Sequence, residues 1–274
     1  MSLLVVSCDA EVAAPTVASR IDAVTRTVGP SPDARYGTSL ASCGALITGA
    51  PGRNSFFSNT SELPLGFSGA GSAVACAMNV VATVAPDAGA IVFTSLPALT
   101  DAGTFKLLDS SISVATNGTG LLVAVGTPLE RCFVGACTGG VLVWQVSGSG
   151  QALVAALRPD AGIDLGTDVA VGRFTGTTNF VFVAAPGAPS PFIVETASPG
   201  LRPMISLWPG VTAIKLATLP GGFGLVFGQP TLSRAVGVLP SSPSLPANSS
   251  WTQNMSVLCS PDSGVGSVVA TGDL

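Results

Sequence analysis

The chain has 274 residues, of which only 9% are charged and 47% are hydrophobic, and its formal net charge is −4. This composition is too apolar for a disordered chain, which needs high charge to stay open. The 11 basic residues are scattered singly, whereas nucleic-acid binding needs clustered Lys and Arg. A membrane-spanning helix needs about 20 consecutive apolar residues, and every apolar run here is shorter. We therefore expect neither a nucleic-acid partner nor a membrane span.

One unit recurs along the whole chain, and each copy opens with small residues that end in an apolar residue and alanine. We call this opening the anchor. A Val-rich run follows and usually closes with a small residue and proline, as expected for β-strands and turns, and helical periodicity is scarce. In chain order the anchors end at Ala41, Ala75, Ala115, Ala170, Ala217 and Ala270, and the runs after the first five anchors end at Pro51, Pro86, Pro128, Pro186 and Pro230.

Further β-rich runs complete most units. Third runs begin at Gly89, Gly140, Pro191 and Ala235, and fourth runs begin at Phe105, Ala152, Met204 and Met255, whereas the unit at Gly37 has poor third and fourth runs. Four short strands in a unit of roughly 35 to 55 residues are typical of a propeller blade. The predicted fold is all-β: a β-propeller of about six four-stranded blades in a single domain, residues 1–274.

The two chain ends complement each other. The start, LLVVSCDA, resembles a strand without its anchor, and the end, VGSVVATGDL, resembles an anchor without its strand. Joined, they would make one complete unit. Two interpretations follow: either the chain closes its own ring by pairing the strand near Leu3 with Gly266–Leu274, or it is a segment of a longer propeller.

The units resemble FG-GAP repeats, which form the blades of integrin α-subunit propellers and their relatives. The resemblance rests on YGTSLASCGALITGAPG (Tyr36–Gly52) and LGTDVAVGRFTGTTNFVFVAAPGA (Leu165–Ala188), and VGSVVATGDL matches the opening of the motif. It implies an extracellular or cell-surface adhesion or ligand-recognition module, which uses loops on one face of the disc for a protein or glycan partner.

Many FG-GAP blades also carry an Asp-rich calcium loop between their first two strands, and this sequence departs from that pattern. Its corresponding segment, AVGRFTGTTNF from Ala170, has Arg173 and no carboxylate. Calcium needs six to eight oxygen ligands, several of them from carboxylates. We therefore predict no metal site and no cofactor.

Catalytic options are few. The chain has no histidine, which rules out a Ser-His-Asp triad and a histidine-based metal centre. A carboxylate pair, as in glycosidases, is the remaining enzymatic route, and we expect a non-enzyme instead because each acidic residue is better explained by a turn. The acidic candidates near strand ends are Asp9, Glu11, Asp87, Asp160 and Asp164. The alternatives to a recognition module are thus a carbohydrate-active propeller enzyme and a purely structural propeller segment of a surface protein.

Loops on one face are the expected place for a ligand, because binding residues concentrate on loops held by a rigid scaffold. Arginine and aromatic residues are over-represented at binding hot spots. The candidate ligand-binding residues are Arg53 and Asn54 after the first Gly-Ala-Pro, and Glu130, Arg131 and Phe133 in a later loop.

Cysteines and sequons favour an oxidising, extracellular environment. Cys132 and Cys137 lie close together in a loop-like stretch and are predicted to form a disulfide, with two reduced thiols as the alternative. Four N-x-S/T sequons, candidate glycosylation sites, occur at Asn59, Asn117, Asn248 and Asn254. The first ten residues contain no convincing signal peptide, because they lack a basic n-region. Either the signal lies upstream of the given start, or the protein stays inside the cell.

Overall fold

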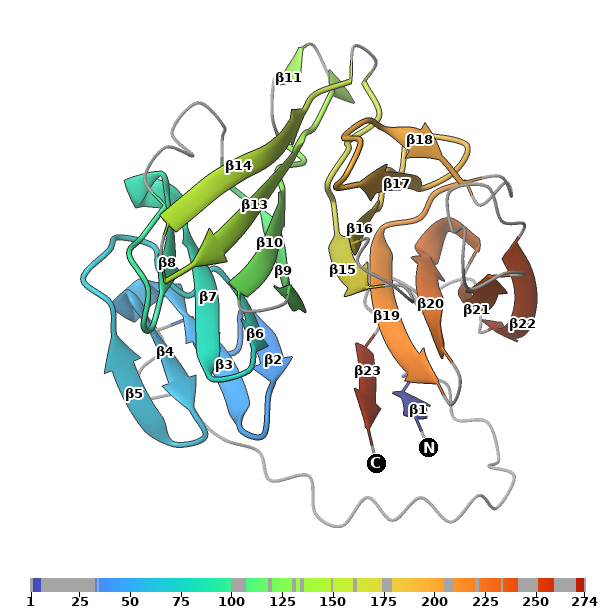
Figure 1. The fold of residues 1–274 in the computed structure, drawn as a ribbon. Coiled ribbons are helices and arrows are strands. Elements are labelled where there is room, and N and C mark those ends of the chain that lie inside the picture. The colour runs from blue at the N-terminus through green and yellow to red at the C-terminus, as the bar shows by residue number, and fades with distance from the viewer. Residues whose placement is uncertain are drawn as a thin grey trace, which may run out of the picture.

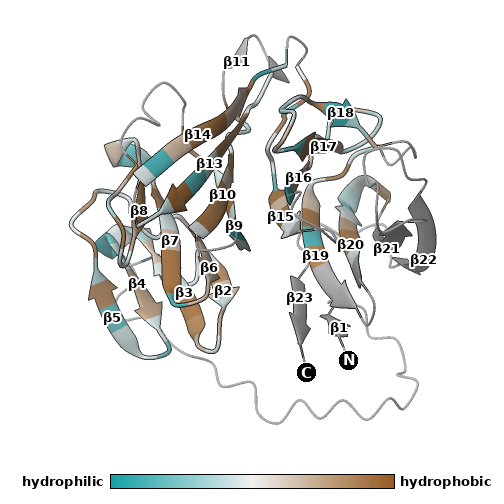
Figure 2. Ribbon diagram, in the orientation of Figure 1, coloured by the Kyte–Doolittle hydropathy of each residue, from teal (hydrophilic) through white to brown (hydrophobic). Residues whose placement is uncertain are grey.

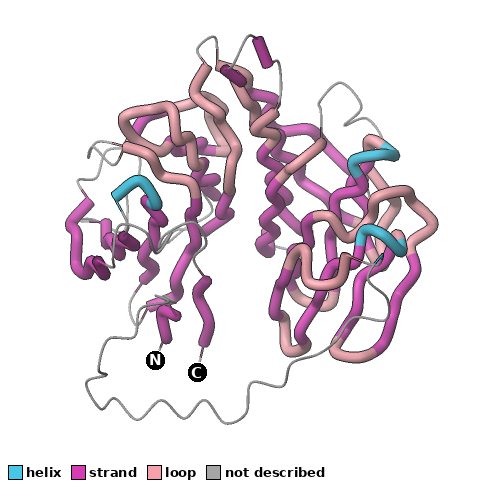
Figure 3. Tube along the Cα trace, turned by 180° about the vertical axis from the view of Figure 1, so that it is seen from behind, coloured by secondary structure: helices cyan, strands magenta, loops and turns pink. Residues whose placement is uncertain are grey.

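The computed structural model describes residues 2–5, 33, 35–99, 107–117, 120–129, 132–133, 136–148, 150–159, 162–173, 179–204, 209–219, 222–232, 234–240, 251–258 and 270–273. Within these ranges the helical elements with defined bounds are short 3-10 turns, η2 (Pro51–Arg53), η3 (Pro86–Ala88) and η5 (Pro230–Leu232) (Figure 3). No helix within these ranges has the length and apolarity needed to cross a membrane.

Five antiparallel sheets of three or four strands follow one another along the chain (Figure 1). Strands that are consecutive in sequence are neighbours in each sheet, except that the hairpin β11–β12 is inserted between β10 and β13. The first sheet contains β2 (Leu40–Ser42), β3 (Leu46–Ala50), β4 (Ser55–Ser58) and β5 (Ser61–Pro64), and the second contains β6 (Ala73–Ala77), β7 (Val80–Ala85) and β8 (Ala90–Phe93).

The third sheet contains β9 (Ser111–Asn117), β10 (Gly120–Gly126), β13 (Val141–Ser147) and β14 (Gly150–Leu157), with the small hairpin of β11 (Cys132–Phe133) and β12 (Ala136–Cys137). The fourth contains β15 (Val169–Arg173), β16 (Asn179–Val183), β17 (Phe192–Glu195) and β18 (Arg202–Pro203). The fifth contains β19 (Ala213–Leu219), β20 (Gly222–Gln229), β21 (Arg234–Pro240) and β22 (Trp251–Leu258).

First strands of neighbouring sheets pack against each other in the order β2, β6, β9, β15, β19 and β23 (Ala270–Asp273). All six anchor alanines lie on these strands, so the repeat seen in the sequence is the unit from which the fold is built. Sheets stacked through their first strands, each ending in an outer edge strand, have the arrangement of a β-propeller. The predicted fold class is therefore confirmed, whereas the number of blades stays a prediction.

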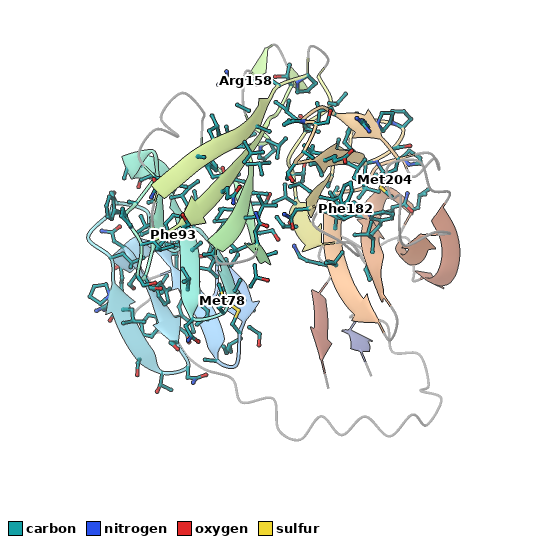
Figure 4. The ribbon with its side chains drawn as sticks, in the orientation of Figure 1. Met78, Phe93, Arg158, Phe182 and Met204 are labelled. Atoms are coloured by element: carbon teal, nitrogen blue, oxygen red, sulfur yellow. A yellow bond between two sulfur atoms is a disulfide. The ribbon has the colours of Figure 1, made fainter. Side chains whose placement is uncertain are left out.

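The second, third and fourth sheets are buried on both faces because each lies between two others. On β10, Val123 and Val125 face a core shared with Phe93 and the second sheet, while Leu122 and Ala124 face a core shared with the fourth sheet. This explains why second strands are nearly continuous hydrophobic runs and do not alternate with polar residues. A further core lies between the fourth and fifth sheets and contains Phe182, Met204, Ile214 and Phe227. Figure 4 labels Phe93 in one half of the molecule and Phe182 with Met204 in the other, and Figure 2 shows the hydrophobic colouring concentrated on the strands.

Two anchor glycines lie where neighbouring sheets make close backbone contact. Gly71 and Gly166 have φ of +99° and +90°, and a Cβ on either would overlap a carbonyl oxygen of the preceding sheet, that of Ser55 or that of Gly140. The carbonyl of each glycine accepts a hydrogen bond of 3.1 Å from a serine at the start of the preceding sheet's first strand. Only glycine combines this backbone conformation with so close an approach.

Two sheets differ from the sequence expectation. The unit at Gly37 was expected to have poor third and fourth runs, yet β4 and β5 pair over four residues each around a turn at Asn59. Conversely, the fourth run expected from Phe105 has a turn at Leu108 and Asp109, and the outer edge of β8 is instead bonded to Leu99 by two backbone hydrogen bonds of 3.0 and 2.8 Å. Local apolar patterning did not show which segment reaches the edge.

The terminal strands pair with each other. β1 (Ser2–Val5) is antiparallel to β23, with Ser2 opposite Asp273 and Val5 opposite Ala270. The pairing expected between the two ends is therefore present, with β23 beginning at Ala270, while Val268 and Val269 lie outside the described residues. Figure 1 shows this pair next to β19, at the opposite end of the series from the first sheet.

Candidate binding surface

The connections between second and third strands leave from equivalent ends of all five sheets. Each connection contains a proline shortly after the last residue of the second strand. The residue before that proline is buried in every case. Because the first strands pack in series and each second strand runs antiparallel to its first, these ends lie on one side of the molecule. We call this side the proline surface, defined by Pro51, Pro86, Pro128, Pro186 and Pro230.

Arg53, a predicted ligand-binding residue, lies in η2 on the proline surface and is held by its own sheet. Its Nε and Nη2 donate to the two carboxylate oxygens of Glu62 on β5 over 2.7 and 3.0 Å, and Ser55 Oγ is 3.0 Å from the same carboxylate. The hydrogen bonds from Arg53, helped by that from Ser55, hold the pKa of Glu62 below its usual value against partial burial, which raises it. With 43% of its side chain exposed, Arg53 can still present its outer face to a ligand.

Asn54, the second predicted residue, has a structural role. It adopts the left-handed conformation with φ of 54°, which lets the chain leave η2 and enter β4. Its Oδ1 accepts a 2.8 Å hydrogen bond from the backbone N–H of Gly69, and its carbonyl accepts one of 3.1 Å from Leu65. The equivalent position after η3 is Gly89, which is also left-handed. The residue at this position is therefore explained by the left-handed backbone conformation that the turn requires.

The remaining predicted residues belong to the β11–β12 hairpin. Phe133 is the second residue of β11, and Glu130 and Arg131 just before it lie outside the described residues. Cys132 is directly opposite Cys137 in the register. Opposed residues of an antiparallel pair have Cα atoms about 4.5 to 5.5 Å apart, within the range of a disulfide. The backbone thus suits the predicted bond, which stays a prediction.

The hairpin is an insertion that its parent sheet does not need, because β10 and β13 already pair over six residues. Figure 1 shows β11 projecting from one end of the molecule, and Figure 4 labels Arg158 at the same end. A projecting hairpin carried on a rigid sheet suits recognition better than folding.

A disulfide that the sequence analysis did not predict joins Cys43, just after β2, to Cys76 on β6, with Cα atoms 6.1 Å apart. It links the first strands of two neighbouring sheets. Both cysteines follow an anchor alanine within two residues, and this shared position was the signal available in the sequence. Closing a loop of 33 residues is worth on the order of 3 to 4 kcal/mol in the chain-entropy account.

The sequons fall in different surroundings. Asn59 is exposed in the turn between β4 and β5, and its Oδ1 accepts a 3.1 Å hydrogen bond from Leu46 N–H. Asn117 ends β9, and its Oδ1 accepts a 3.0 Å hydrogen bond from Nδ2 of the buried Asn179. Asn254 lies in β22 at a register shift, and Asn248 is outside the described residues.

The acidic candidates do not form a described pair. Asp87 in η3 is exposed and accepts a 3.3 Å hydrogen bond from Ser68 Oγ, and Asp164 is a left-handed turn residue before β15. Asp9, Glu11 and Asp160 lie outside the described residues. Within the described ranges no group of three or more His, Cys, Asp or Glu side chains is arranged to hold a metal ion.

A salt bridge that the sequence analysis did not predict, which we call the charged joint, links Asp168 of the fourth sheet to Lys215 of the fifth. Asp168, in the anchor before β15, accepts hydrogen bonds of 2.9 and 2.7 Å from Lys215 Nζ on β19 and one of 3.0 Å from Ile214 N–H. The Asp168 side chain is 14% exposed. The two residues occupy consecutive anchors, GTDVA and AIKLA, and only the packing of first strands brings them together.

One of the comparisons with known proteins supports the fold. No protein-family model and no curated protein matches the chain. Among solved structures, BBS1N, described in complex with ARL6DN, aligns with a TM-score of 0.50 and 12% identity over 82% of this chain and 67% of that chain. Hsv2 of Kluyveromyces lactis aligns with a TM-score of 0.44 and 13% identity over 80% of this chain and 73% of that one. BBS1N and Hsv2 are β-propeller proteins, and at such low identity the similarity to BBS1N shows the fold alone.

Proposed function

We propose that this propeller is an extracellular recognition or adhesion module, related to FG-GAP propellers such as those of integrin α-subunits, that binds a protein or glycan through its proline surface without catalysing a reaction. The observation that carries the proposal is the β11–β12 hairpin, a projecting insertion that adds no strand to its parent sheet. Projecting segments on a rigid scaffold are the usual carriers of binding.

Other features support the same reading. BBS1N, a propeller similar in fold, is described in a complex with a protein, ARL6DN. The Cys43–Cys76 disulfide and the sequon at the exposed Asn59 fit a secreted protein, since disulfides persist in oxidising compartments. Because Arg53 and Asn54 have partners within the fold, the proposed contact residues are mainly Glu130, Arg131 and Phe133 of the hairpin region.

The test is binding of the whole chain, made by secretion, to glycan and extracellular-protein arrays. A specific ligand should appear, and the double variant Arg131→Ala/Phe133→Ala should weaken its binding at least tenfold, since arginine and aromatic residues dominate hot spots. Leu63→Ala, an exposed residue on the outer strand β5, is the control and should bind as the wild type does. Absence of any ligand would favour a purely structural propeller, and a ligand unaffected by the double variant would place the site elsewhere.

Secretion also tests the environment that the proposal assumes. Mass mapping of the secreted protein should find Cys132 bonded to Cys137 and a glycan on Asn59, whose side chain is exposed. Two free thiols at Cys132 and Cys137 after secretion would contradict the predicted clip.

A further inference from the structure

The outer strand of the third sheet, β14, is an open and uncharged edge. Its sequence is GQALVAAL, and Gly150, Gln151, Ala152 and Leu153 are all exposed, Leu153 by 55%. Among the described residues no backbone hydrogen bond reaches β14 from outside its own sheet. Figure 2 shows β14 on the outside of the sheet, white to brown over most of its length.

The other outer strands are protected. β5 has four residues, with the charged Glu62 and a terminal Pro64, and β18 has two residues, Arg202 and Pro203. The edge of β8 is occupied by Leu99, and β22, as long as β14, is rich in polar residues and contains a sequon. Charges, proline, short length and covering segments are the means by which proteins keep a sheet edge from pairing. Only β14, of these five edges, combines length with an apolar and uncharged sequence.

The exposed end of β14 has a fixed, regular backbone that suits strand pairing. Gln151 Nε2 donates a 2.6 Å hydrogen bond to the carbonyl of Pro97, which ties the start of β14 to the neighbouring sheet. The register with β13 is continuous from Gly150 to Leu153 and shifts only at Val154. A regular segment of four exposed residues is therefore available before the irregularity.

We propose that β14 pairs antiparallel with β14 of a second copy of this chain, so that the third sheets of two molecules join across a two-fold axis. An antiparallel strand pair is self-complementary under such an axis, as a two-fold interface requires. The strand carries no charge, so a second copy places no like charges opposite each other, which would be destabilising. Main-chain hydrogen bonds supply the attraction, as in other cases of strand addition, and Leu153 and Ala152 lose their exposure to water.

The test is the oligomeric state of the whole chain, measured by sedimentation velocity between 1 and about 100 μM, for the wild type, Leu153→Lys and Leu108→Lys. Leu108 is as exposed as Leu153, at 56%, but lies in a turn before β9, so it is a matched control for the loss of apolar surface. We expect a wild-type dimer, a Leu108→Lys dimer, and at least a tenfold weaker dimer for Leu153→Lys, because an edge lysine opposes pairing. Circular dichroism of each variant checks that it is folded, and amide exchange at Gln151–Leu153 should slow on dimerisation.

Every other pattern overturns the proposal. A monomeric wild type up to the highest concentration shows that the edge stays open. Equal dimerisation of wild type and Leu153→Lys places the contact elsewhere, and equal weakening by both lysine variants shows general apolar association. A dimer without slower exchange at Gln151–Leu153 also contradicts strand pairing. These results can be told apart from ligand binding by the hairpin, because Leu153→Lys changes none of the residues proposed to contact a ligand, Glu130, Arg131 and Phe133.

Discussion

Two buried threonines, Thr83 and Thr127, differ in whether their hydroxyl groups are bonded. Thr83 Oγ1 accepts a 2.8 Å hydrogen bond from Gly71 N–H and donates one of 2.8 Å to the Ala73 carbonyl. Thr127 occupies the buried position before a proline, where three of the other four sheets have alanine, and its Oγ1 has no partner. A buried hydroxyl without a hydrogen bond costs about 1 to 3 kcal/mol.

The same substitution at the two positions should therefore have opposite effects. Thr127→Val keeps the side-chain volume, removes the unbonded hydroxyl and should stabilise the fold by about 1 kcal/mol. Thr83→Val removes two hydrogen bonds, leaves Gly71 N–H unpaired and should destabilise it by about 1 to 3 kcal/mol. Urea denaturation midpoints of the two variants and the wild type measure both, and a Thr127→Val midpoint below that of the wild type would contradict the first.

At this scale the sequence did not reveal the described disulfide, and the predicted one stays a prediction. The short spacing of Cys132 and Cys137 predicts an opposed pair, and the register places them opposite each other. The bond between Cys43 and Cys76 was missed because it depends on which first strands become neighbours, and that is a property of the assembled fold. The partner of Arg53 was missed for a different reason, because Glu62 lies on β5, a strand with a weak apolar pattern. The partner of Asn54, Gly69 N–H, is a backbone group that no side-chain pattern marks.

At the scale of elements, the anchor glycine Gly166 allows close backbone contact between neighbouring sheets. Gly166→Ala should lower the unfolding free energy by at least about 2 kcal/mol, since alanine combines strain at positive φ with overlap against the Gly140 carbonyl. Gly148→Ala is the matched control, because a Cβ at Gly148 meets no atom within 4 Å, and it should change stability by less than about 0.5 kcal/mol. Similar midpoints for the two variants in urea would rule out this role of the anchor glycine.

The charged joint predicts an asymmetry between its two partners. Asp168→Ala leaves Ile214 N–H without its acceptor in a mostly buried site and should cost about 2 to 3 kcal/mol. Lys215→Met should cost about 1 kcal/mol or less, because Lys215 is 36% exposed and Asp168 keeps its backbone donors. Thermal and urea unfolding of both variants give the order, and a larger loss for Lys215→Met would show that the ion pair, rather than the backbone hydrogen bond, stabilises the joint.

Much of the element order could be predicted from the sequence, because anchors and prolines mark the beginning and end of each inner pair of strands. Five prolines follow five second strands, and six anchor alanines lie on six first-strand positions. Outer strands were predicted less well, since edges are chosen by tertiary contacts: Leu99 bonds the edge of β8, and Ser61–Pro64 forms a strand despite its weak apolar pattern.

At the scale of the whole molecule, the sheets pack in series, and the first and last strands of the chain pair with each other. A propeller is stabilised by stacking each sheet between neighbours, so the terminal pair adds both a ladder of hydrogen bonds and contacts with β19. The sequence suggested this pairing, because the first and last residues complement each other as parts of one unit. The ligand could not be inferred in the same way, since loop residues follow no repeat.

The pairing of β1 with β23 is tested most directly by removing residues 270–274 and comparing urea midpoints with the full chain and with a chain lacking only Leu274, which lies beyond β23. The ladder joins four residue pairs, and its loss should lower the unfolding free energy by about 2 to 4 kcal/mol and raise self-association through the exposed edge of β1. Removal of Leu274 alone should leave the midpoint unchanged. Equal midpoints for all three chains would contradict a propeller whose terminal strands pair with each other.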